Sequence, residues 1–311
     1  MQYRPLGDTT VSAVGLGAMP LSIEHRPDEA RAIATLHAAL DAGVTLIDTA
    51  DSYHWHADET GHNELLVARA LARYGADTSH VLVATKGGRG RPGDGSWTVT
   101  GTPGHLKRAA EASLRRLGGD AIGLYQLHKP DPAVPWAESV GALHELLDAG
   151  TIRAAGISNV TCEQIREAHA ILGDGLVSVQ NQYSPAVRDS EPELRLATEL
   201  GLAFLPWSPL GGISRSSLDG PSGPASTRTP PATPPATSPA TSTSTSTSPG
   251  TAFHRLAAAR GVSPQQVALA WLLSRSPAVI PVPGASRPAS IQDSANAAEL
   301  GLGAVELAQL A

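Results

Sequence analysis

The segment GVTLID (residues 43–48) contains the unit from which we derive the fold: a glycine that ends a helix, followed by a short apolar strand. Residues 27–42 before it carry apolar side chains at helical spacing, and glycine suits the left-handed position that ends many helices. The strand is too short for a helix and lacks clean polar alternation, which is typical of strands buried on both faces. A helix that leads into such a strand indicates an α/β protein.

The same unit recurs along the chain. Seven further apolar runs are predicted as strands, over residues 13–16, 81–85, 122–127, 154–157, 176–180, 202–206 and 278–281. Amphipathic helices are predicted between them, over residues 63–74, 103–117, 136–149, 161–172 and 191–200. Eight strands that alternate with helices favour a (β/α)8 TIM barrel, which we expect to span residues 1–311 as one domain. Residues 2–4 and 10–12 predict an N-terminal β-hairpin that caps the bottom of the barrel.

An open doubly wound sheet is the alternative architecture. It would require a GxGxxG turn that follows a strand directly and opens a helix. The corresponding segment here, GLGAMP (residues 15–20), lacks the third glycine and continues into proline. The sequence therefore favours the barrel.

Residues 214–250 form a low-complexity insertion in the loop after the seventh strand. From 221 to 250 the chain consists of Pro, Ser, Thr, Ala and Gly, with Arg228 as its single charge. Such a composition buries too little apolar surface to offset the entropy of ordering, so we predict disorder there.

Composition also excludes several classes of partner. The net charge is −6 and the arginines are scattered, so neither nucleic acid nor an anionic membrane is an expected partner. The N-terminus lacks the apolar core of a secretory signal, and no 18-residue apolar run occurs, so we expect a cytoplasmic protein. The single cysteine, Cys162, rules out an internal disulfide and a cysteine-based zinc site.

Four polar residues stand at or just beyond the ends of successive predicted strands. Asp48 ends the second strand and Tyr53 follows it, Lys86 follows the third, and His128 follows the fourth. Each alone has a structural explanation, such as capping a turn or packing at the rim. Because active sites of TIM barrels lie at the C-terminal ends of the strands, we predict that the four act together.

This tetrad suits the reduction of a carbonyl group. Hydride transfer to C=O creates an alkoxide, which needs a proton, and Tyr53 can donate one. A phenol with a pKa of about 10 is a reluctant acid, and the ammonium of Lys86 is expected to lower that pKa. Asp48 would hold Lys86 through an ion pair, and His128 would orient the carbonyl oxygen. Since no side chain supplies hydride, a nicotinamide cofactor is required.

Further motifs follow in order at matching intervals, over residues 43–53, 61–64, 84–86, 114–117, 124–130, 156–159, 179–184 and 206–211. Together they resemble the aldo-keto reductase family, in its short actinobacterial form, over nearly the whole chain. The resemblance implies an alcohol:NADP+ oxidoreductase that uses NADPH to reduce an aldehyde or ketone, with Tyr53 as the proton donor. We expect a small-molecule carbonyl substrate, and a monomer or weak oligomer.

The resemblance also assigns cofactor contacts to matching positions. The group at the nicotinamide end comprises Gly17, Ala18, Met19, Asp48, Ser158, Asn159, Gln180 and Trp207. The group near the pyrophosphate comprises Ser208, Pro209, Leu210 and Gly211. The group at the adenosine end comprises Gly284, Ser286, Arg287, Asp293 and Ser294. The guanidinium of Arg287 suits the 2′-phosphate of NADPH, and Ser294 replaces the asparagine usual in the family.

Two other functions compete with this assignment. His54, His56, Asp58, Glu59 and His62 could form a metal cluster of a barrel hydrolase, but later strand ends offer no such ligand except His128, so no metal site is predicted. The other competitor is an NADPH-binding sensor with negligible turnover, similar to the potassium-channel beta subunits that share this fold.

Overall fold

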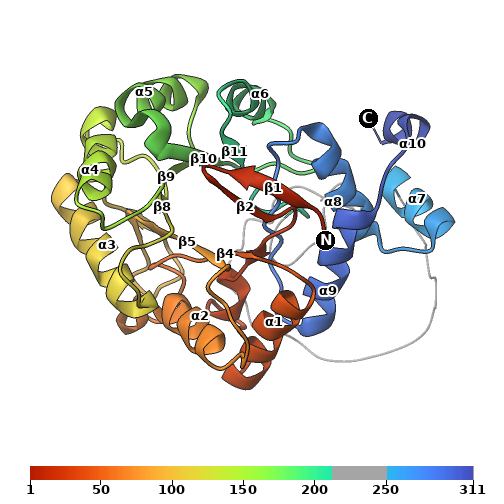
Figure 1. Cartoon of the computed structure of the whole chain (residues 1–311), viewed down its shortest axis with the longest axis horizontal. Coiled ribbons are helices and arrows are strands. Elements are labelled where there is room, and N and C mark those ends of the chain that lie inside the picture. The colour runs from red at the N-terminus through yellow and green to blue at the C-terminus, as the bar shows by residue number, and fades with distance from the viewer. Residues whose placement is uncertain (212–250, 311) are drawn as a thin grey trace, which may run out of the picture.

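The structure, a computed structural model, describes residues 1–211 and 251–310. Its centre is a parallel sheet of seven strands in the order β11-β10-β9-β8-β5-β4-β3, which curls into a ring (Figure 1). The strands are β3 (Leu16–Gly17), β4 (Leu46–Asp48), β5 (Leu82–Gly87), β8 (Leu124–Leu127), β9 (Ala155–Ser158), β10 (Leu176–Gln180) and β11 (Ala203–Phe204). The predicted insertion, residues 214–250, lies outside the described residues.

The last predicted strand, residues 278–281, is not a regular strand but still closes the ring. Phe204 of β11 forms a parallel bridge with Val279, and Gly17 of β3 forms one with Gly284. The carbonyls of Pro281 and Pro283 accept hydrogen bonds of 2.9 Å from the amides of Gly15 and Gly17. Because proline has no N–H, these two residues cannot complete a ladder. The (β/α)8 barrel is thus confirmed, with an irregular eighth segment.

The helices surround the sheet, and most of them pack against the next one along the chain (Figure 1). Six of the predicted helices are confirmed with ends shifted by at most two residues: α1 (Glu29–Asp41), α2 (His62–Ala72), α3 (Pro103–Leu117), α4 (Trp136–Asp148), α5 (Cys162–Leu172) and α6 (Glu191–Glu199). After the seventh strand come α7 (Ala252–Arg260), α8 (Pro264–Arg275), α9 (Pro288–Asn296) and α10 (Ala304–Gln309). In the described ranges, no helix has both the length and the apolar character needed to span a bilayer.

Side-chain caps explain where several helices begin. The carboxylate of Asp28 accepts from the amide of Arg31 at 2.8 Å at the start of α1. Thr161 and Gln164 form a capping box at the start of α5. Ser263 Oγ accepts from the amide of Gln266 at 3.0 Å at the start of α8. These contacts satisfy amides that the first helical turn leaves unpaired.

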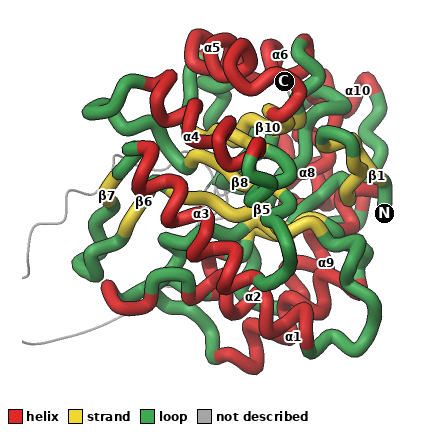
Figure 2. The backbone as a smooth tube through the Cα atoms, turned by 60° about the vertical axis from the view of Figure 1, so that its left-hand side comes forward, coloured by secondary structure: helices red, strands yellow, loops and turns green. Residues whose placement is uncertain are grey.

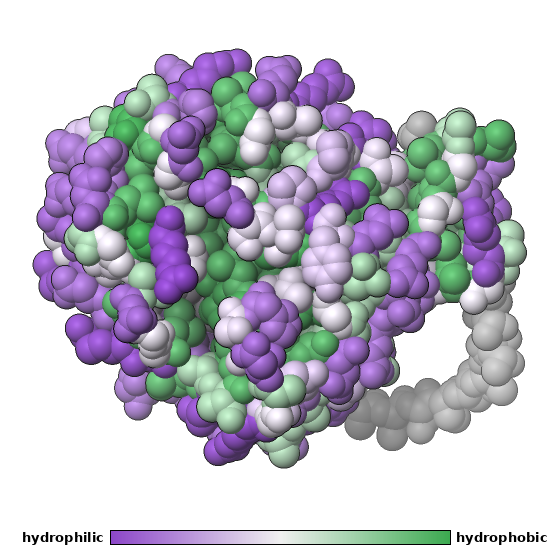
Figure 3. Space-filling view, in the orientation of Figure 1, coloured by the Kyte–Doolittle hydropathy of each residue, from purple (hydrophilic) through white to green (hydrophobic). Residues whose placement is uncertain are grey.

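The N-terminal hairpin covers the bottom of the barrel, as predicted. Strands β1 (Tyr3–Leu6) and β2 (Thr9–Ser12) pair antiparallel, and Leu6 and Val11 are buried in the same cluster as Val177 and Ile280. The guanidinium of Arg4 donates to three carbonyls between residues 273 and 279, which fastens the hairpin to the barrel. Figure 3 shows polar side chains around most of the rim of this face, with apolar ones between them.

A second small hairpin stands at the opposite end. It consists of β6 (Arg89–Gly90) and β7 (Thr98–Val99), which pair antiparallel in the loop after β5. In Figure 2 this hairpin and β1 lie on opposite sides of the molecule. The end marked by β6 and β7 is where the parallel strands terminate, and it holds the predicted site.

Candidate active site

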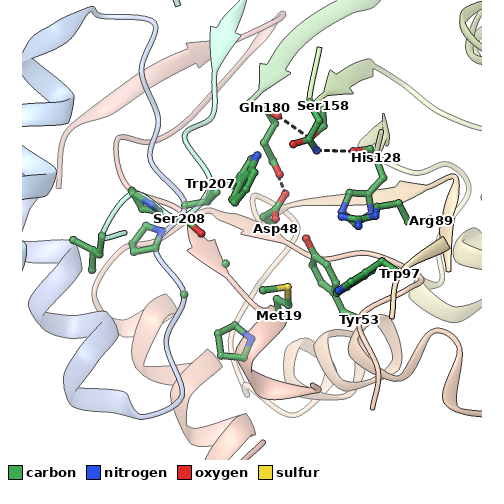
Figure 4. A pocket seen from close by; sticks show the side chains of 18 residues that line it. Met19, Asp48, Tyr53, Arg89, Trp97, His128, Ser158, Gln180, Trp207 and Ser208 are labelled. Carbon is green, nitrogen blue, oxygen red and sulfur yellow. Dashed lines mark hydrogen bonds between the residues drawn. The ribbon is translucent and has the colours of Figure 1, made fainter. Parts of the chain in front are cut away.

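The ends of three neighbouring strands bring the predicted tetrad together (Figure 4). Asp48 is the last residue of β4, Lys86 lies in β5, His128 follows β8, and Tyr53 lies in the loop after β4. All four are buried: the largest exposed fraction is 6%, at Tyr53, and Lys86 is fully buried. Parallel strands that end at one edge explain why residues so far apart in sequence meet here.

The ammonium of Lys86 is the centre of the tetrad. Its Nζ donates to Asp48 Oδ2 at 2.6 Å, to the carbonyl of Thr49 at 2.9 Å and to Tyr53 Oη at 3.0 Å. Burial acts to lower the pKa of Lys86, but the Asp48 carboxylate and the Tyr53 oxygen outweigh it and raise that pKa above its usual value. Lys86 therefore remains charged inside the barrel, as predicted.

The other carboxylate oxygen of Asp48 is also held. Oδ1 accepts from Gln180 Nε2 at 2.9 Å and from Gln126 Nε2 at 3.3 Å. Gln126 was not predicted from the sequence, although it precedes His128 by two residues and pairs in register with Lys86. Because residues two apart on a strand share a face, that spacing was the available signal. The two glutamines fix the orientation of Asp48.

Tyr53 has a pKa shifted in the direction opposite to the prediction. Burial raises the pKa of Tyr53 above its usual value of 10.0, and the charge and hydrogen bond of Lys86 oppose that rise without reversing it. The predicted influence of Lys86 has the right sign, but desolvation is the larger effect. Tyr53 is therefore a neutral phenol at pH 7, which is the form that can give up a proton.

His128 is a neutral imidazole. Burial, followed by the positive charges of Lys86 and Arg89, lowers the pKa of His128 well below 6.5. Its Nδ1 lies 3.4 Å from Ser52 Oγ, and its ring meets that of Tyr53 edge to face at a centroid distance of 5.6 Å. A neutral imidazole has one N–H, so His128 can donate a hydrogen bond to an oxygen placed beside Tyr53.

A second buried layer lies behind the tetrad. Glu64 accepts from Thr85 Oγ1 at 2.5 Å and from Arg116 Nε at 2.6 Å, which anchors β5 next to Lys86. Burial and the neighbouring Glu64 raise the pKa of Asp51 to about 8. Gly61 is required here, because it has φ +83° and a Cβ on it would lie 2.1 Å from Arg116 Nε.

The tetrad opens into a pocket of about 260 Å³. The predicted cofactor residues that line it are Gly17, Met19, Asp48, Ser158, Asn159, Gln180, Trp207, Ser208, Pro209, Leu210 and Gly284. Val282 and Pro283, which the family resemblance places with Gly284 in the segment expected to hold the 2′-phosphate, line the pocket as well. The lining residues that the sequence analysis missed are Pro20, Arg89 and Trp97. Of these, Arg89 and Trp97 come from the small hairpin after β5, and loops at strand ends are where such residues concentrate.

One wall of the pocket has polar groups suited to a carboxamide. Asn159, with φ +60°, donates from Nδ2 to the carbonyl of His128 at 2.9 Å and to Ser158 Oγ at 3.0 Å. Ser158 Oγ donates in turn to the carbonyl of Gln180 at 2.7 Å. The indole Nε1 of Trp207 is buried, and no described residue accepts from it. This orphaned donor and the indole ring beside the tetrad fit a planar, polar ring such as nicotinamide.

The remaining predicted cofactor residues lie outside the pocket. Ala18 is buried behind it, with its amide donating to the carbonyl of Asp48 at 2.9 Å, and Gly211 is in the turn after Leu210. Ser286, Arg287, Asp293 and Ser294 lie at α9 or just before it. Their adenosine contacts stay predictions.

Two of these side chains have partners of their own. Arg287 is exposed and donates from Nε to Ser290 Oγ at 2.8 Å. Asp293 accepts from Ser263 Oγ and from Gln266 Nε2, both at 2.6 Å. Arg287 thus keeps its terminal nitrogens available for a phosphate, whereas Asp293 faces the start of α8.

The histidines of the alternative metal cluster bond elsewhere. His54 Nδ1 lies 2.7 Å from the carbonyl of His56, and His62 Nδ1 lies 2.9 Å from Ser22 Oγ. Glu59 forms an ion pair with Arg26 at 2.7 Å. Within residues 1–211 and 251–310, no three His, Cys, Asp or Glu side chains are grouped so that they could hold a metal ion.

Fold and site together define a TIM-barrel protein with a buried acid–base group at the strand ends. The sequence profile of the Aldo/keto reductase family matches residues 13–311, and the chain belongs to that family.

Individual relatives agree with this membership. The 6-dehydroglucose reductase of Novosphingobium aromaticivorans is 32% identical over 300 residues, which cover 95% of this chain and 90% of the relative. The structure of a glycerol dehydrogenase from Gluconobacter oxydans has a TM-score of 0.77 at 28% identity, covering 99% of this chain and 93% of the other. An aldo-keto reductase from Klebsiella pneumoniae in complex with NADPH has a TM-score of 0.74 at 28% identity, covering 100% and 94%.

Proposed function

We propose that this protein reduces an aldehyde or ketone to the alcohol, with NADPH as the hydride donor. The observation that carries the proposal is the buried chain of contacts from Asp48 through Lys86 to Tyr53, at 2.6 and 3.0 Å, on the wall of a pocket. Family membership supports the reaction class, and the NADPH complex of the Klebsiella relative supports the cofactor.

The cofactor, when bound, supplies a hydride to the carbonyl carbon. Tyr53 donates its phenolic proton to the carbonyl oxygen as the C=O π electrons move to that oxygen, which completes the alcohol. The phenolate left on Tyr53 is stabilised by the Lys86 ammonium 3.0 Å away and regains a proton from water. His128 donates a hydrogen bond that orients the carbonyl oxygen.

The residues present fit NADPH along the pocket and beyond it. Ser158, Asn159 and Gln180 would hold the carboxamide, and Trp207 would lie against the nicotinamide ring. Arg287, exposed near the pocket-lining Gly284, would bind the 2′-phosphate through charge-assisted hydrogen bonds. A cytoplasmic location and a monomeric or weakly oligomeric state stay predictions.

The decisive experiment is NADPH consumption by the full chain against a panel of aldehydes, ketones and α-dicarbonyls. Tyr53→Phe keeps the ring and removes the hydroxyl, so turnover should fall by roughly 10² or more while NADPH still binds. Quenching of tryptophan fluorescence measures that binding independently. Tight NADPH binding without turnover of any carbonyl by the wild type would overturn the proposal in favour of the sensor. Near-normal turnover by Tyr53→Phe would remove Tyr53 as the proton donor.

A further inference from the structure

Two arginines from the hairpin after β5 contact the same tryptophan beside the tetrad. The guanidinium carbon of Arg89 lies 4.4 Å from the centroid of the Trp97 ring, and that of Arg91 lies 4.6 Å from it. Trp97 in turn meets the ring of His128 at a centroid distance of 6.4 Å. The indole therefore links both cations to the residue that orients the carbonyl.

The two arginines differ in their partners. Arg91 forms a two-pronged ion pair with Glu24 and donates to the carbonyl of His54 at 2.9 Å. The side chain of Arg89 has neither an ion pair nor a hydrogen bond with any residue in the described ranges. The Nε of both arginines is buried without an acceptor, so the difference lies in their terminal nitrogens. One of the two charges is thus neutralised by the protein and the other is not.

The unpaired guanidinium faces the reaction. Arg89 lines the same pocket as Tyr53 and His128, whereas Arg91 does not line it. The charge of Arg89 lowers the pKa of His128, after burial and the charge of Lys86. In Figure 4, Arg89 is on the side of His128 and Trp97, across the pocket from Ser208. The segment predicted to face the pyrophosphate is therefore on the other side.

A half-buried guanidinium without an anion is an unfavourable arrangement unless a ligand completes it. Burial removes water from the charge, and contact with an aromatic face offsets only part of that cost. The planar fork of donors in arginine matches the two oxygens of a carboxylate, or two oxygens of a phosphate.

We propose that Arg89 is a specificity-determining residue that binds an oxyanion, a carboxylate or a phosphate, carried by the carbonyl substrate. The inference rests on the proposed reduction and names the substrate class of that same site. The carbonyl would lie between Tyr53 and His128, with the anionic group against Arg89 and the carbon skeleton along Trp97.

The test compares aldehydes that carry an anionic group with neutral counterparts of the same carbon skeleton. One pair is 4-carboxybenzaldehyde and its neutral methyl ester, and a second pair is glyceraldehyde 3-phosphate and glyceraldehyde. For the wild type, kcat/KM should be higher for the anionic member of at least one pair, and which pair responds distinguishes carboxylate from phosphate. Arg89→Gln should reduce that anionic-to-neutral ratio about 10- to 100-fold, mainly through KM, as expected when hydrogen bonds to a charged group are lost. Arg89→Lys should retain part of the ratio.

Arg91→Gln is the matched control, because it removes a cation from the same indole but not from the pocket. Its anionic-to-neutral ratio should stay at the wild-type value, whatever happens to the absolute rates. If the wild type reduces neutral aldehydes and Arg89→Gln leaves the ratio unchanged, the inference is wrong while the proposed function stands. If Arg89→Gln instead weakens NADPH binding at an unchanged ratio, Arg89 serves the cofactor and the inference is again wrong. Absence of any carbonyl reduction by the wild type contradicts the proposed function itself.

Discussion

The tetrad at the strand ends and the start of α9 are both predicted to bind the same cofactor–substrate pair, yet they are built differently. The tetrad residues are buried at the ends of three strands, and Lys86 contacts both Asp48 and Tyr53 directly. At the start of α9, Arg287 is exposed, and among the described residues its side chain bonds only to Ser290 in its own turn. The protein itself holds the reacting groups in place. At the adenosine end, the Arg287 guanidinium would be held in place only when a ligand binds to it. The preorganisation of the reacting groups favours the stabilisation of charge that develops during proton transfer.

The strongest test of this contrast is Lys86→Met. Removing one partner of a buried ion pair leaves Asp48 charged and unpaired, so we expect turnover to be lost and the free energy of unfolding to fall by about 3–5 kcal/mol. The control is Lys107→Met, which removes an exposed ion pair of the same length, 2.6 Å, with Glu145 and should cost less than about 1 kcal/mol. Urea unfolding of both variants measures the difference. Equal losses of unfolding free energy in the two variants would show that the buried ion pair contributes no more to stability than the exposed one.

A second test measures how the stability of the protein depends on pH through Asp51 in the buried layer. The pKa of Asp51 is about 8 in the folded protein and near 3.9 in an unfolded chain, so the native state retains a proton that the unfolded state releases. Its contribution to stability is complete below about pH 4 and is lost as the pH rises to about 8. Asp51→Asn cannot lose that proton, so the melting temperature should fall less between pH 5 and pH 8 than in the wild type. Asp120→Asn, at an exposed position, should follow the wild-type curve.

At the adenosine end, Arg287→Ala should change binding and not folding. NADPH binding should weaken by roughly 1.5–3 kcal/mol, the range for a hydrogen bond to a charged group. NADH lacks the 2′-phosphate, so its dissociation constant should hardly change. Titration calorimetry with both cofactors decides the matter, and equal losses would assign Arg287 to the fold.

The smallest effect should come from Asp293. Its carboxylate holds Ser263 and Gln266 at the start of α8, so Asp293→Ala should lower the free energy of unfolding by about 1–2 kcal/mol. The effect on NADPH affinity should be smaller than that of Arg287→Ala. A selective loss of NADPH affinity at unchanged stability would instead show that Asp293 contacts the adenine of the cofactor.

The same contrast explains what the sequence could predict. Short apolar runs and helical spacing located the strands and helices, and the strand ends located the tetrad, because the barrel dictates where those residues meet. The shift of the Tyr53 pKa could not be predicted, because it depends on how completely the ring is buried. Arg89 and Trp97 were missed, since their approach to the pocket depends on the hairpin of β6 and β7 in an otherwise unpatterned loop. The prolines at 281 and 283 are visible in the sequence, and they explain why the eighth strand is irregular.

The irregular eighth segment makes one junction of the barrel, where it meets β3, weaker than the others. Along it, Pro281 and Pro283 accept from Gly15 and Gly17 but donate nothing in return. Local opening of the barrel should therefore be most frequent at this junction. We expect faster amide exchange at Gly15 and Gly17 than at the paired amides of β5. Gly17 and Gly284 form a bridge across this junction, and both line the pocket. A bound dinucleotide would therefore contact both sides of the junction and hold them together. If amide exchange at Gly17 and Gly284 is slower in the presence of NADPH, the bound cofactor also stabilises this part of the barrel wall.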